Sequence, residues 1–63
     1  MMTLEYDGKE IAVEPWRADA QTLVHAQLVL SMRPSCARGP VRLTGTLYAD
    51  VRDGRVEVYH VVS

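Results

Sequence analysis

Apolar and polar residues alternate on both sides of an Asp-Gly dipeptide close to the start of the chain, Asp7-Gly8. An Asp-Gly pair between alternating residues is typical of a two-residue hairpin turn. In that register one face carries the apolar side chains, with only Lys9 out of pattern: Met2, Leu4, Tyr6, Ile11 and Val13. The opposite face carries Thr3, Glu5, Glu10, Ala12 and Glu14. This separation of the two faces predicts a β-hairpin in which Glu5 lies opposite Glu10.

A second Asp-Gly dipeptide, Asp53-Gly54, predicts a second hairpin by the same argument. The two-residue loop pairs Tyr48 with Tyr59 on one face. It gathers the apolar residues on the other face: Val41, Leu43, Gly45, Leu47, Ala49, Val51, Val56, Val58 and Val62. A three-residue loop would pair Val51 with Arg55 and mix apolar with charged residues, so the two-residue loop is favoured.

Residues 19–33 fit either a helix or a strand. Asp19 is a suitable N-cap, Pro34 would end the helix, and the segment is rich in the helix-favouring residues Ala, Gln, Leu and Met. However, apolar and polar residues also alternate from Thr22 to Met32, which is typical of a strand. Capping and composition favour the helix and periodicity favours the strand; we adopt the helix.

The helix gives a single small α+β domain over residues 1–63, a small antiparallel sheet of two β-hairpins with one intervening helix, in the order ββαββ. The strand would instead give an all-β five-stranded small barrel or sandwich, with Gly45 available for a bend. Two prolines and a glycine between residues 34 and 40 predict a loop.

Length and charge limit what such a chain can do. A chain of 63 residues buries a modest core, and its single cysteine, Cys36, excludes an intrachain disulfide. Compact packing, self-association or a binding partner must then supply additional stability. The net charge of -1 does not indicate a nucleic-acid polycation, although residues 33–63 carry five arginines against three acids. There is no signal peptide or membrane-spanning run, and a lone thiol suits a reducing compartment, so we expect a cytoplasmic protein.

The tyrosine face of the second hairpin is the strongest candidate for a binding surface. It would display Tyr48 beside Tyr59, with Arg52 and Arg55 nearby, and it is either open to a partner or covered by residues 15–33. Tyrosine and arginine are enriched in protein-interface hot spots, and they can also stack on bases and hold phosphates. Further arginines, Arg33, Arg38 and Arg42, lie in or beside the loop. We therefore assign partner binding to Tyr48, Tyr59, Arg52, Arg55, Arg42 and Arg38.

Other reactive side chains do not assemble into a site. Cys36 lies near arginines that could activate a thiol, but neither His25 nor His60 stands at a spacing diagnostic of a catalytic dyad or a metal site. His60 and Trp16 are expected at the edge of the core. The sequence therefore predicts no enzyme, no cofactor and no metal.

The function predicted from these residues is a non-enzymatic protein-binding module, an inhibitor or adaptor. The layout resembles that of the very small ββαββ proteins with which phages inhibit host enzymes or CRISPR complexes, which would imply the host cytoplasm. This resemblance is one of layout and includes no motif. The alternatives are a nucleic-acid-binding module that uses the arginine and tyrosine face, and a structural subunit of a larger assembly, with homo-oligomers among the expected states.

Overall fold

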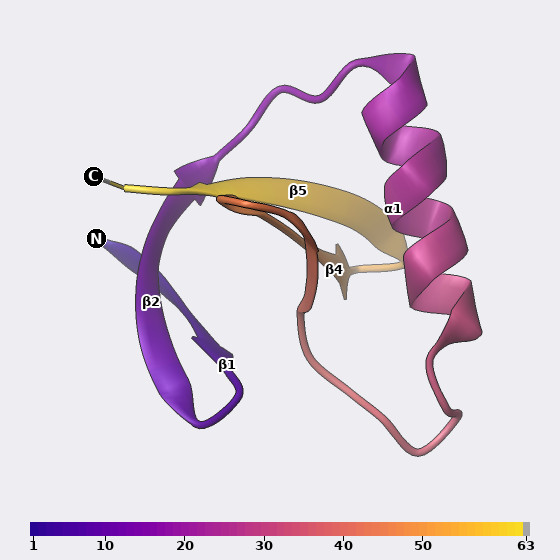
Figure 1. Ribbon diagram of the computed structural model, residues 1–63, viewed down its shortest axis with the longest axis horizontal. Helices are drawn as coiled ribbons and strands as arrows, with labels where there is room; N and C mark the ends of the chain where they lie inside the picture. The colour runs from indigo at the N-terminus through magenta and orange to yellow at the C-terminus, as the bar shows by residue number, and fades with distance from the viewer. Residues whose placement is uncertain (63) are drawn as a thin grey trace.

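The computed structural model describes residues 1–62 and consists of one antiparallel sheet and one helix (Figure 1). The strands are β1 (Met2–Tyr6), β2 (Lys9–Pro15), β3 (Val41–Thr44), β4 (Leu47–Arg52) and β5 (Arg55–Val61), and the helix α1 (Ala20–Met32) lies between β2 and β3. The five strands are ordered β1-β2-β5-β4-β3 across the sheet. The α+β class with a small antiparallel sheet is therefore confirmed.

Both hairpins have the register that the sequence predicts. Met2 pairs with Val13 and Glu5 with Glu10 in the first hairpin, and Tyr48 pairs with Tyr59 in the second. The two residues of each Asp-Gly turn have positive φ, at 54° and 77° in the first turn and 53° and 74° in the second. This conformation matches the right-handed twist of the flanking strands and explains why Asp-Gly selects the two-residue loop.

The predicted order ββαββ is wrong in one respect, because the structure has a third strand after the helix. Residues 41–52 fold back on themselves at Gly45 and Thr46, so β3 pairs with β4 as an additional antiparallel strand. Gly45 has φ of 43°, in the left-handed region that favours glycine. A register shift between Arg42 and Thr44 keeps Val41 opposite Ala49, on the same face of the sheet. The order is therefore ββαβββ.

The helix forms where capping and composition place it. The Asp19 side chain accepts a hydrogen bond of 2.8 Å from the Thr22 backbone N–H, and the helix ends at Met32, two residues before Pro34. That hydrogen bond lowers the pKa of the Asp19 carboxyl below its ordinary value, because it favours the ionised form. One side of α1 packs on β3, β4 and β5 through a core of Ala26, Leu30, Ala49 and Val58.

The opposite face of the sheet has its own apolar cluster, because the sheet curls. In β2, Val13 lies opposite Val61 and Pro15 opposite Tyr59, which puts the apolar face of the first hairpin on the same side as the tyrosines. The Tyr6 and Tyr48 rings meet edge to face with centroids 5.1 Å apart. In a flat sheet β1 and β4, three strand spacings apart, would be separated by about 14 Å. The sheet is therefore a half-barrel that is concave on the tyrosine side (Figure 1).

Because of this curl the tyrosine face is covered, but by the first hairpin and not by residues 15–33. Tyr48 is 7% and Tyr59 4% exposed, and both belong to the core. The first hairpin covers them, because its apolar face had no other surface to pack against once α1 occupied the convex side of the sheet. Burying two aromatic side chains is worth several kcal/mol, which favours the curled over the flat sheet.

Candidate partner-binding hollow

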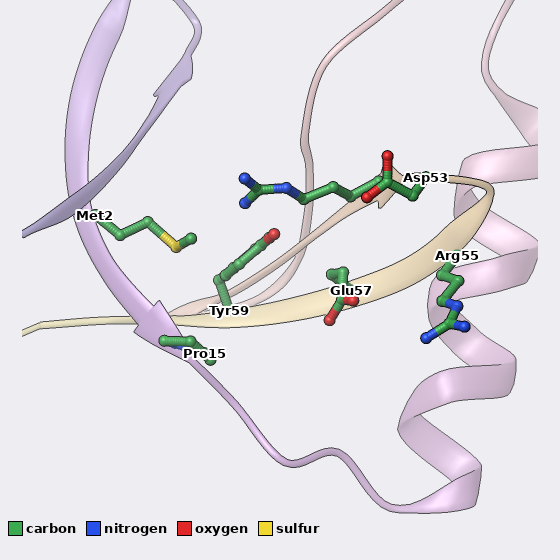
Figure 2. A pocket seen from close by; sticks show the side chains of 7 residues that line it. Met2, Pro15, Asp53, Arg55, Glu57 and Tyr59 are labelled. Carbon is green, nitrogen blue, oxygen red and sulfur yellow. The ribbon is translucent and has the colours of Figure 1, made fainter.

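An open hollow lies on the concave side of the sheet, where the first hairpin curls towards the second. Its volume is about 550 Å³, and it is lined by Met2, Pro15, Arg52, Asp53, Arg55, Glu57 and Tyr59. A second hollow of about 510 Å³ adjoins it and shares Met2, Arg52 and Tyr59. The two form one concave surface with an apolar floor. Figure 2 shows the side chains of Met2 and Tyr59 beside each other there, with Glu57 and Arg55 further along β5.

Charged residues surround this floor as two like-charged pairs. Arg52 lies directly opposite Arg55, and Asp50 directly opposite Glu57, across β4 and β5. Like charges opposite one another destabilise a sheet unless something neutralises them. Within residues 1–62, no ion pair joins either arginine to these acids. With Asp53 at the turn, the rim therefore presents two positive and three negative groups that a partner of opposite charge would neutralise.

The structure brings together half of the residues assigned to partner binding. Tyr59, Arg52 and Arg55 line the hollow. Tyr48 lies beneath the surface against Tyr6, and Arg42, its cross-strand neighbour, donates a hydrogen bond of 3.3 Å to the Gly45 carbonyl. Arg38 is exposed in the loop that joins α1 to β3 and does not line the hollow.

The arginines near the loop do not form one free basic patch. Arg33 is part-buried and donates a hydrogen bond to the Gly39 carbonyl, which braces the loop. Arg42 makes the hydrogen bond to Gly45 described above. On the concave face, Asp50, Asp53 and Glu57 stand among Arg52 and Arg55, so the positive charge there is not continuous. A nucleic-acid surface needs a continuous positive track along the backbone, and this arrangement does not supply one.

The remaining candidate residues are spread over the molecule. Cys36 is a free, exposed thiol. Trp16 is 45% exposed and stacks on His60 with ring centroids 4.8 Å apart, and the Nδ1 atom of His60 lies 3.9 Å from a Glu14 carboxylate oxygen. His25 lines a separate hollow of about 310 Å³ between α1 and the strands β3 and β4. Among residues 1–62, no group of three His, Cys, Asp or Glu side chains could hold a metal ion.

Sequence reasoning missed the residues that turn the tyrosine face into a hollow. Met2 and Pro15 come from the first hairpin, and they reach Tyr59 only because β2 pairs with β5. That pairing joins residues more than 40 positions apart, and no local pattern signals it. One signal was available: the apolar face of the first hairpin needed a surface to cover it.

Comparison of the chain with protein-family models, curated proteins and solved structures found no match. In the part of the chain that the structure describes, no helix is long and apolar enough to cross a membrane.

Proposed function

We propose that the protein is a non-enzymatic protein-binding module of the cytoplasm, an inhibitor or adaptor, and that its partner docks in the concave hollow. This proposal rests on one observation: two like-charged pairs surround an apolar floor, and neither pair is neutralised. Arg52 and Arg55 would contact acidic groups of the partner, and Asp50 and Glu57 would contact basic groups. Met2 and Pro15 would supply apolar contact beneath them.

Interface physics supports this use of the hollow. Charge pairs across an interface give specificity and raise the association rate, while aromatic and arginine side chains supply much of the affinity. A partner segment with neighbouring acidic and basic residues would relieve the repulsion on both sides of the β4–β5 hairpin. The hollow is open and mixed in charge, which suits a segment of another protein better than a small apolar ligand.

The test is affinity capture with the full chain from a lysate of the cells that produce it, followed by mass spectrometry and titration of the purified partner. We expect Arg52→Glu to weaken binding by at least about 2 kcal/mol, roughly thirtyfold. Arg17→Glu is the matched control, because it makes the same charge change at an exposed position that does not line the hollow. Equal effects of the two variants would overturn the proposal.

Salt dependence separates this proposal from nucleic-acid binding. Protein binding through rim charges of both signs should weaken modestly with salt, whereas phosphate binding weakens steeply as counterions are released. Capture of nucleic acid, with an affinity that falls steeply as the salt concentration rises, would identify the alternative function.

A further inference from the structure

Three apolar side chains lie on the side of α1 that faces away from the sheet. Val24, Leu28 and Met32 are 63%, 58% and 75% exposed. Their spacing of four residues places them in a row along the helix. Ala26 and Leu30, on the opposite side of α1, are buried against the sheet. The helix is thus apolar on two opposite sides, and the sheet covers only one of them (Figure 1).

The outer side of α1 carries no charged residue. All seven basic and eight acidic residues of the chain lie outside residues 20–32. The other exposed residues of the helix are Ala20, Gln21, His25, Gln27 and Ser31. A partner selected by charge complementarity gains nothing on this surface, whereas two copies of the chain can meet here without like-charge repulsion.

The row is also self-complementary. If two helices cross antiparallel on a two-fold axis through Leu28, that residue meets its own copy, and Val24 meets Met32 of the partner subunit. Rows of residues four apart interdigitate at a crossing angle of about 50°, with helix axes about 8–10 Å apart. From this geometry we infer that the chain forms a symmetric dimer through the outer face of α1.

The area of this face sets the strength of the dimer. A standard interface buries about 800 Å² on each partner, which is about one sixth of the 4780 Å² accessible surface of this chain. The eight exposed residues of α1, at roughly 60–90 Å² each, offer about 500–700 Å². The dimer is therefore weak and reversible, with a Kd on the order of micromolar or higher. It leaves the hollow free, because α1 and the hollow lie on opposite sides of the sheet.

Sedimentation of the full chain across concentrations around that Kd tests the dimer. We expect a reversible monomer–dimer equilibrium, and we expect Leu28→Glu to weaken it by roughly a hundredfold, because two carboxylates would meet on the axis. Ser35→Glu is the matched control, because it adds the same charge at an exposed position in the loop after α1, outside the proposed interface. Circular dichroism verifies that both variants fold. A chain that stays monomeric at every concentration, or equal effects of the two variants, would overturn the dimer.

Disulfide trapping tests the antiparallel arrangement in a Cys36→Ser background. Leu28→Cys should cross-link to its own copy, because the axis places the two sulfurs within bonding reach. Val24→Cys alone should cross-link poorly, and should do so efficiently only with Met32→Cys in the second copy. Efficient cross-linking of Val24→Cys to itself would refute this geometry. If the chain is monomeric yet binds a partner through Arg52, the dimer fails while the proposed function stands.

Discussion

Truncation of Tyr48 tests whether the tyrosines on the concave side of the sheet are part of the core. Replacing a buried aromatic side chain by alanine costs about 3–5 kcal/mol, because it removes apolar contact and leaves a cavity. Tyr48 is 7% exposed, and its ring also meets Tyr6 edge to face at 5.1 Å. A domain of this length has a total stability of roughly 3–9 kcal/mol. Tyr48→Ala should therefore lower the melting temperature by about 12 °C or more, or leave the chain unfolded at room temperature.

The assay is chemical and thermal unfolding followed by circular dichroism. Tyr48→Leu keeps part of the buried volume and should stay folded, so it gives a measurable loss even where Tyr48→Ala unfolds. Tyr48→Phe is the control, because it keeps the ring and its contact with Tyr6 and should change stability by about 0.5 kcal/mol or less. A Tyr48→Ala protein that melts cooperatively within a few degrees of the wild type would refute the burial of this ring. A double-mutant cycle that combines this series with Tyr6→Ala measures the interaction free energy of the two rings, which we expect to be about 0.5–1.5 kcal/mol.

Three further changes test the helix cap, the thiol and the third strand. Asp19→Asn keeps a capping group but removes a carboxylate whose pKa is lowered in the folded state. The wild type should therefore be more stable than this variant above about pH 4, and the difference in stability should vanish as acid protonates the carboxylate. A constant difference between the two melting temperatures down to about pH 2 would contradict this. Cys36→Ser should melt within a few degrees of the wild type, since the thiol is exposed and unbonded, and a large loss would assign it a structural role. Gly45→Ala should cost about 1 kcal/mol in denaturant unfolding, because residue 45 has positive φ, and Gly45→Asn should cost less; equal stability of all three chains would argue against the turn.

Local patterns were sufficient to predict each hairpin. The Asp-Gly turns set the register, and the alternation of faces allowed only one loop length, so Glu5 opposite Glu10 and Tyr48 opposite Tyr59 followed from neighbouring residues alone. Alternation could not reveal the turn at Gly45. The register shift beside it keeps the apolar residues of β3 and β4 on one face, as they would be in an uninterrupted strand. Two features argued against such a strand: 12 residues exceed the usual span, and a glycine such as Gly45 inside a strand can mark a bend.

The burial of the tyrosines could not be predicted from either hairpin separately. It depends on the pairing of Val13 with Val61, which turns the apolar face of the first hairpin towards Tyr59. The exposure of one side of the helix could not be predicted from the sequence for a different reason. With one row of apolar residues facing the sheet and another facing away, residues 20–32 lack the single stripe of an ordinary surface helix, and their periodicity resembled that of a strand. Residues 20–32 thus fitted both a helix and a strand because one apolar row of the helix is left uncovered.

The curl of the sheet gives the molecule two surfaces of opposite character. On the concave side it buries Tyr48 and places Met2 beside Tyr59, which leaves a charged rim on an apolar floor. On the convex side it leaves α1 as the only cover of β3, β4 and β5 within the described residues, with an uncharged outer face. A dimer through α1 would direct its two hollows away from each other. Such a dimer would bind a partner more tightly than a monomer could when the partner carries two matching segments on a linker long enough to reach both hollows, because the second contact then forms at a high effective concentration. Leu28→Glu would then remove this gain in avidity and preserve the affinity of each hollow, whereas Arg52→Glu would remove both.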